Sequence, residues 1–420
     1  MADSQSASSQ FLAQWTNPGD VFSVLLIVGA DVIQLALAAL TGHTLTPIAF
    51  SFGWVAYGIS AVVSALGENR LMRCGPEVGM TVVNLDSGYD RDNNSWVLSR
   101  MVRTFDFWAA KEVKKAMGDV HILPKDEEQG LIALNGEAPE MHAALCVAVY
   151  KWVDGATPGV ATLDAAWWSG LVVSVVQLGI AAIPWGLHGN WGIFVATAGG
   201  TLLAYLSASF PQWKKEKWYT RVRNKDVALV PSPPRGNGGR LALVVLGADH
   251  GFDLEALAGG LTPDLISTRI YTGILAIFWL VLLITCTGIK TDTWYLMAVG
   301  GLGMTHNLVV AGVPRQPKAL GFPIELVKTV DTTGGDPIPH VFTEYKVMWS
   351  LMELELKYPG KGKPLVGPFF PGKLLPWEEE WWKLETSFER RRELLRKAKQ
   401  NQWAKLTKPK QSGLNVEVTK

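Results

Sequence analysis

Six stretches of mostly apolar residues, each close to twenty residues long, dominate the pattern of hydrophobic and polar positions along the chain. They cover residues 22–40, 45–66, 168–187, 191–210, 270–289 and 294–313. A helix that crosses the hydrocarbon core of a bilayer needs about 20 such residues. Short connections join the stretches in pairs at residues 41–44, 184–190 and 290–292. The pattern predicts an all-α polytopic membrane protein, with six transmembrane helices in three tight hairpins and mixed α/β cytoplasmic segments.

The hairpins divide the chain into seven regions. These are an N-terminus (1–21), hairpin 1 (22–66), a polar segment (67–167), hairpin 2 (168–210), a polar segment (211–269), hairpin 3 (270–313) and a C-terminal region (314–420). Because each hairpin contains two helices, the three long segments must face the same side. Lys290 is the only Lys or Arg in the opposite loops. The positive-inside rule therefore predicts that the N-terminus and the long segments are cytoplasmic, with the endoplasmic reticulum as the default membrane.

The long segments carry predicted elements of their own. Residues 80–85 and 241–247 are typical of strands, and residues 95–117 and about 341–357 have helical spacing. The stretch 376–406 predicts a charged amphipathic helix, because Pro376 suits a helix start, acids fill the first turn and Lys and Arg dominate the end. Its charges form either a solvated face or a surface that docks on anionic lipid.

Composition narrows the function classes. Charged residues make up 18% of the chain and the formal net charge is +1, so nothing indicates a nucleic-acid partner. The three cysteines are far apart, and no HExxH or CxxC motif is present, so no metal and no cofactor is predicted. Membrane lipids are the expected surroundings, and the oligomeric state stays open.

Polar residues inside the apolar stretches are the candidate site. Asp31 lies in the middle of the first stretch, where a carboxyl group costs roughly 2.5–3.5 kcal/mol on insertion scales. Gln34 shares its helix face. At 1.5 Å per residue, Gln177 and His306 fall within about one turn of the depth of Asp31. The remaining candidates are Asn307 beside His306, and Trp54 and Tyr57 on one face of the second stretch.

Two interpretations of these residues are open. Asp31 either pairs with His306 or an amide to fix helix packing, or faces an enclosed pocket as an acid, since ionisable residues at this depth often mark a site. Trp54 and Tyr57 either pack in the core or contact a ligand.

A resemblance bears on this choice. The segment VVNLDSGYDRDNNSWVLSRMVRTFD (82–106), followed in order by RGNGG (235–239), a short apolar strand and GFDLEAL (251–257), resembles a group of fungal integral membrane proteins. A characterised part of that group is the membrane-bound terpene cyclases of meroterpenoid pathways, as in ascofuranone and macrophorin biosynthesis. The resemblance implies cyclisation of the farnesyl chain of a prenylated phenol, quinol or epoxyquinol, started by protonating an epoxide or alkene without metal.

Under that hypothesis the site residues take specific roles. Asp31 is the general acid, and His306 tunes it or acts as the terminating base. Trp54 and Tyr57 stabilise positive charge. The side chains of Gln34, Gln177 and Asn307 orient the acid and the lipophilic substrate. Two alternatives are a proton-coupled transporter with an Asp31–His306 relay and a non-enzymatic membrane scaffold.

Overall fold

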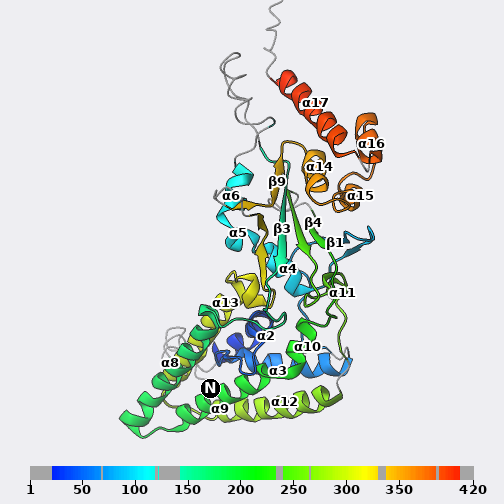
Figure 1. The fold of residues 1–420 in the computed structure, drawn as a ribbon. Coiled ribbons are helices and arrows are strands. Elements are labelled where there is room, and N and C mark those ends of the chain that lie inside the picture. Colours follow the sequence, from blue (N-terminus) through cyan, green and yellow to red (C-terminus); the bar gives the residue numbers. More distant parts are fainter. Residues whose placement is uncertain are drawn as a thin grey trace, which may run out of the picture.

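The computed structural model describes residues 21–67, 70–118, 122, 142–232, 240–263, 266–329, 337–384 and 387–406, with the side chains of 21–28 outside the description. Figure 1 shows two parts, a helical layer at the bottom and a sheet domain with its covering helices above it. The predicted N-terminal segment 1–21 lies, except for Val21, outside the described residues, and so does RGNGG (235–239).

The helical layer contains the six predicted apolar stretches. Its helices are α2 (Val21–Leu40), α3 (Gly53–Gly67), α8 (Ala165–His188), α9 (Gly192–Ala208), α10 (Pro211–Lys217), α12 (Ile266–Thr287) and α13 (Thr293–Gly312). Each apolar stretch forms a helix over most of its length, except that residues 45–52 of the second stretch are irregular.

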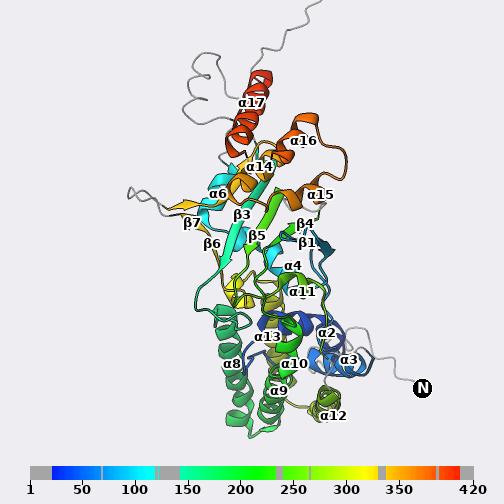
Figure 2. The ribbon, with the colours of Figure 1, turned by 45° about the vertical axis from the view of Figure 1, so that its right-hand side comes forward.

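The predicted fold class is nevertheless wrong. Among the described residues only α8 and α12 are long and apolar enough to cross a membrane, and α9 becomes a third span only if α10 is counted with it across a 42° bend. Shorter apolar stretches of helix are Gly29–Leu40, which is the part of α2 whose side chains the structure describes, and Gly53–Gly67. Figure 2 shows α8 upright and α12 nearly end-on, so these two helices run in very different directions. Six parallel spans in three tight hairpins are not formed.

A seven-stranded mixed sheet also contradicts the all-α class. The strand order is β2-β1-β4-β5-β3-β6, and β9 pairs with β3 as well. β3 and β5 form a parallel pair, while the other pairs are antiparallel. The strands are β1 (Met80–Asn84), β2 (Asp90–Asp92), β3 (Leu145–Trp152), β4 (Val227–Pro231), β5 (Leu241–Leu246), β6 (Ile324–Leu326) and β9 (Val341–Glu344), and β7 (Lys328–Thr329) pairs separately with β8 (Ile338–Pro339). All three long polar segments therefore contribute to one domain.

Both faces of this sheet are covered. Val82 and Leu229 belong to the core that is continuous with the helical layer, whereas their neighbours Val83 and Ala228 belong to a second core on the other face. This alternation follows from the two-residue repeat of a strand. The covering elements are α4 (Trp96–Arg103), α5 (Phe105–Trp108), α6 (Lys111–Gly118), α11 (Leu254–Ala258), η2 (Pro317–Leu320), α14 (Val347–Lys357), η3 (Lys363–Leu365), α15 (Val366–Phe369), α16 (Pro376–Lys383) and α17 (Phe388–Leu406).

Several elements of the long segments match their predictions. Strands at 80–85 and 241–247 are confirmed as β1 and β5. The helical stretch 95–117 is divided into α4, α5 and α6, and the stretch 376–406 into α16 and α17. Pro376 stands in the first turn of α16, as predicted.

Buried charged side chains join the helical layer to the sheet domain. Arg100 of α4 donates from Nη2 to the carbonyl oxygens of Ala311 (2.7 Å) and Val313 (3.1 Å), at the end of α13. Its Nη1 contacts Glu77 Oε1 at 2.9 Å. A helix end leaves four carbonyl groups without intrahelical partners, and a cation there also offsets the helix dipole. Arg100 supplies both effects to α13.

The end of α2 is held in the same way. Lys217 Nζ donates to the carbonyl oxygens of Thr41 (2.8 Å) and Ala39 (3.3 Å), and Arg315 also donates to Ala39. Arg315 binds Asp164, the N-cap of α8, through Nε at 2.6 Å and Nη2 at 2.8 Å. Residues 41–44 were predicted to be a tight turn on the side opposite the long segments. Instead, residue 41 directly follows the end of α2, which lies on the side of the helical layer that faces the sheet domain.

Replacement of Arg100 tests this junction. In Arg100→Met the carbonyl groups of Ala311 and Val313 stay buried without a donor, and we expect the free energy of unfolding in detergent to fall by about 3–5 kcal/mol. Arg103→Met is the matched control, because Arg103 binds the same Glu77 but its side chain is 57% exposed. We expect a change within about 0.5 kcal/mol there. Equal losses in both variants would contradict the capping role.

The Asp164–Arg315 pair predicts a pH dependence of stability. Burial raises the pKa of Asp164, but the hydrogen bonds from Arg315 and its positive charge outweigh burial and leave the pKa below its ordinary value. A lowered folded-state pKa stabilises the protein above the unfolded value of about 3.9, and this stabilisation is lost as pH falls through the folded value. We expect Asp164→Asn, which keeps an N-cap oxygen, to be less stable at neutral pH and to lose less stability below about pH 4. Identical pH profiles of thermal unfolding would contradict this.

Candidate functional site

An irregular segment lies inside the helical layer between α2 and α3. Residues 41–42 and 46–52 are buried, and regular helix resumes only at Gly53. The second predicted span, 45–66, therefore begins as buried coil rather than as helix. Irregular backbone is tolerated in an apolar layer only where protein groups satisfy its hydrogen bonds. Side chains from the surrounding helices must supply the donors.

Two of the predicted site residues are these donors. Gln177 Nε2 donates to the carbonyl oxygens of Phe50 (2.7 Å) and Val299 (2.8 Å). Asn307 Nδ2 donates to the carbonyl oxygen of Ala49 at 3.0 Å. Both side chains are fully buried. Their contacts hold the irregular segment in place, as the packing interpretation expects, and the substrate-orienting roles of both residues stay predictions.

Glycines let the neighbouring helices approach the same segment. A Cβ atom at Gly303 would lie 1.8 Å from the carbonyl oxygen of Phe50, and one at Gly170 would lie 1.9 Å from that of Pro47. At such distances the Cβ atom of any other residue at position 170 or 303 would collide with the backbone of the irregular segment. The irregular segment is thus enclosed by backbone contact on α8 and α13 as well as by amide hydrogen bonds.

An aromatic cluster adjoins this segment. Trp54 stacks on Trp279 of α12 with ring centroids 5.3 Å apart, and Tyr57 meets Trp54 edge-on at 5.5 Å. The ring centroid of Trp213 of α10 lies 6.4 Å from that of Tyr57, and Phe50 also stacks on Trp279 with centroids 6.3 Å apart. The prediction that Trp54 and Tyr57 share a helix face is confirmed by this contact.

A small cavity lies among these rings. Tyr57, Trp213 and Trp279 line it together with Ser207 and Leu71, and its volume is about 20 Å³. That space holds about one water molecule. A prenyl chain fits there only after the surrounding helices separate.

The structure does not bring Asp31 and His306 together. Asp31 is exposed and Gln34 is half-buried. The buried face of α2 carries Ile33 instead, so Asp31 points away from the core. His306 Nε2 lies 3.0 Å from Ser169 Oγ of α8. The expected enclosed acid paired with an imidazole is therefore absent from the described residues, while the catalytic roles of both residues stay predictions.

A buried carboxylate does lie near the aromatic rings. Glu216 of α10 accepts hydrogen bonds from the backbone N–H groups of Leu71 (2.9 Å) and Met72 (2.7 Å), and from Gln212. Leu71 lines the cavity, and Trp213 stands one turn before Glu216 on the same helix. In the sequence, Glu216 stands within a run of lysines, KKEK (214–217), shortly after the fourth apolar stretch, and was not among the predicted site residues. The i, i+3 spacing of Trp213 and Glu216 was the available signal.

The described ranges contain no group of three or more His, Cys, Asp or Glu side chains arranged to hold a metal ion. Comparison of the chain with protein-family models, characterised proteins and solved structures finds no match.

Gly303 offers a direct test of the enclosed segment. In Gly303→Ala the new methyl group must displace the Phe50 backbone, and we expect a loss of about 1–3 kcal/mol in unfolding free energy. Gly301→Ala is the control on the same helix, because no atom lies within 4 Å of its added Cβ. Alanine favours a helix over glycine, so the control should be neutral or slightly stabilising. Similar stabilities of the two variants, measured by unfolding in detergent, would contradict the close approach.

Proposed function

We propose that this chain is a membrane-embedded enzyme that binds a lipid-soluble prenylated small molecule at the aromatic cluster and cyclises its prenyl chain after protonation. The observation that carries the proposal is a buried carboxylate, Glu216, beside an aromatic cavity. Glu216 accepts a hydrogen bond from the backbone of Leu71, which lines that cavity together with Tyr57, Trp213 and Trp279. We assign proton transfer to Glu216 because it is buried and hydrogen bonded to the backbone of the cavity residue Leu71, whereas Asp31 is exposed.

The surroundings of Glu216 suit carbocation chemistry. Faces of Trp and Tyr rings attract positive charge by about 0.5–2 kcal/mol each, most strongly when water is excluded. The cavity admits about one water molecule, so a cation formed there would be shielded from capture by solvent. Gln212 fixes the carboxylate, and Thr268 of α12 donates to Gln212 Oε1 at 3.0 Å.

Substrate entry requires α12 to move. The polar contacts that α12 makes at this site are the Thr268–Gln212 bond and the Trp279 Nε1–Ser207 Oγ bond of 3.3 Å. Its outer face exposes large apolar side chains such as Ile277 and Ile284. Separation of α12 from α3 and α10 would open the cavity toward lipid, where a prenyl tail partitions.

The carrier hypothesis gains no support from this geometry, because Asp31 and His306 share no contact among the described side chains. One observation favours the scaffold hypothesis, namely the small volume of the cavity. The sheet domain would then bind a partner while the helical layer served as an anchor.

An isomerase assay separates these functions. Microsomes that contain the protein would receive farnesylated phenols and epoxyquinols, with and without a terminal epoxide. We expect a cyclised isomer from the unmodified protein and from Asp31→Asn, and a loss of about 10²-fold or more in Glu216→Gln, since a positioned acid contributes 10²–10⁴-fold. Lys215→Gln, an exposed neighbour on α10, is the matched control.

The opposite pattern, with activity lost in Asp31→Asn and kept in Glu216→Gln, would return the acid role to Asp31. Absence of any isomer from folded, unmodified protein would overturn the enzyme proposal and support the scaffold.

A further inference from the structure

A charged cleft lies where the sheet domain meets the helical layer, beside α11. Its volume is about 470 Å³, within the range of small-molecule sites. Four cations and two acids line it, which leaves a formal charge of 4 − 2 = +2. These residues are Arg91, Arg221, Arg223, Lys225, Asp253 and Glu255. The cleft is separate from the aromatic cluster, and it plays no part in the proposed cyclisation.

The two acids of the cleft are already engaged. Lys225 Nζ contacts Asp253 at 3.0 Å and Glu255 at 2.9 Å, and Asp253 also caps α11 through the N–H of Ala256. Glu255 accepts a further hydrogen bond from Asn84. These contacts neutralise Lys225 and fix both carboxylates in position. The net positive charge of the cleft therefore belongs to its arginines.

The arginines keep unused donors. Among the described residues, no carboxylate pairs with the side chains of Arg221 and Arg223, and both are exposed. Arg91 Nη2 lies 4.0 Å from Glu255, and its buried Nε has no hydrogen-bond acceptor. A guanidinium group presents paired N–H donors that match the oxygen atoms of a phosphate. Three such groups converge on one cleft.

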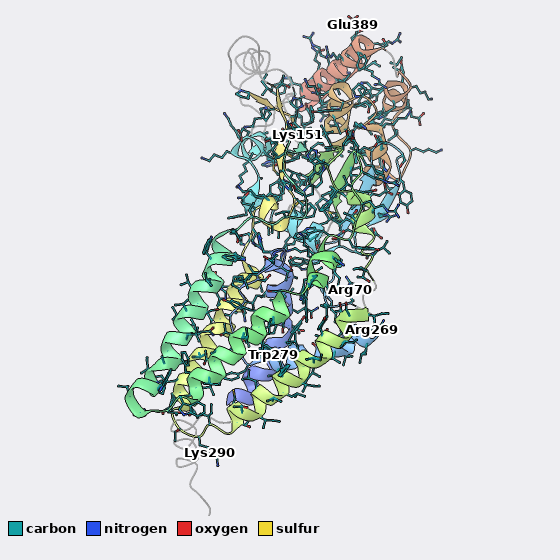
Figure 3. All side chains as sticks on the ribbon, turned by 60° about the horizontal axis from the view of Figure 1, so that its bottom comes forward. Arg70, Lys151, Arg269, Trp279, Lys290 and Glu389 are labelled. Atoms are coloured by element: carbon teal, nitrogen blue, oxygen red, sulfur yellow. The ribbon has the colours of Figure 1, made fainter. Side chains whose placement is uncertain are left out.

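The position of the cleft indicates which phosphate it would meet. Two residues that line the cleft are close in sequence to helices of the helical layer. Arg221 follows the end of α10 at Lys217, and Leu261 precedes the start of α12 at Ile266. Leu261 and Tyr219 on its rim are 66% and 44% exposed. Figure 3 shows Arg70 and Arg269 at the same edge of the helical layer, whereas Lys290 lies at the far end. A phosphate held there would have apolar helices beside it, as a lipid headgroup does.

We infer that this cleft binds the phosphate headgroup of an anionic phospholipid, with Arg221, Arg223 and Arg91 as its donors. Exposed Leu261 and Tyr219 contact the start of the acyl chains. Juxtamembrane basic residues are attracted to anionic leaflets by about 1 kcal/mol each, and a formed cleft adds headgroup geometry to that attraction. Binding is saturable, with one lipid in each cleft.

Titration of the purified full chain in neutral detergent tests this site. The probes are short-chain fluorescent phosphatidic acid, the matching phosphatidylcholine and inorganic phosphate as competitor. We expect saturable binding of phosphatidic acid alone, weakened about tenfold or more in Arg221→Gln/Arg223→Gln. The control is Lys214→Gln/Lys215→Gln, which removes two exposed cations of α10 outside the cleft and should change affinity less than threefold.

Each other outcome overturns the inference. Equal weakening in both double variants would mean diffuse attraction to surface charge. Competition by inorganic phosphate at the same concentration as the lipid would identify a free phosphate ligand rather than a lipid. Absence of saturable binding, with the unfolding temperature of every variant unchanged, would leave the cleft without this ligand.

Discussion

Capping of buried helix ends by charged side chains is the constraint on which the rest of this structure depends. The ends of α2 and α13 lie against the sheet domain rather than in water, so their free carbonyl groups need protein donors. Arg100 supplies them for α13, and Lys217 and Arg315 supply them for α2. These bonds fix the helical layer to the sheet domain and set the point at which the irregular segment enters the layer.

The same demand for donors explains most polar residues in the apolar helices. Gln177 and Asn307 satisfy the backbone of residues 49–50, and His306 is hydrogen bonded to Ser169. Each therefore has a structural partner. Glu216 is also held by backbone N–H groups, but one of these belongs to Leu71, which lines the aromatic cavity. Ligand chemistry is thus best sought at α10 rather than at the middle of α2.

The length of the apolar runs predicted where helices form, but it did not predict whether protein or lipid surrounds each helix. Ile33 and Leu37 of α2 are fully buried in protein, and an apolar run that packs against protein has the same composition as one that faces lipid. Strands β3 and β4 were not predicted. Both of their faces are buried, as in β5, so each is a short continuous apolar run without the alternation that marks a half-buried strand. The residues 45–52 were counted as helix from composition alone, although Pro47 lacks the N–H that a helix interior requires.

The sheet also dictates an order of events during synthesis. Val147 of the central strand β3 pairs with Ala242 of β5 and with Phe342 of β9, so its two neighbours emerge from the ribosome long after it does. Between them the chain must deliver α8, α9, α12 and α13 into the helical layer. Such distant pairings slow folding, because loop-closure entropy is lost before the contacts form. Until those residues are made, β3 is an apolar strand with unpaired edges, and such strands are prone to aggregation.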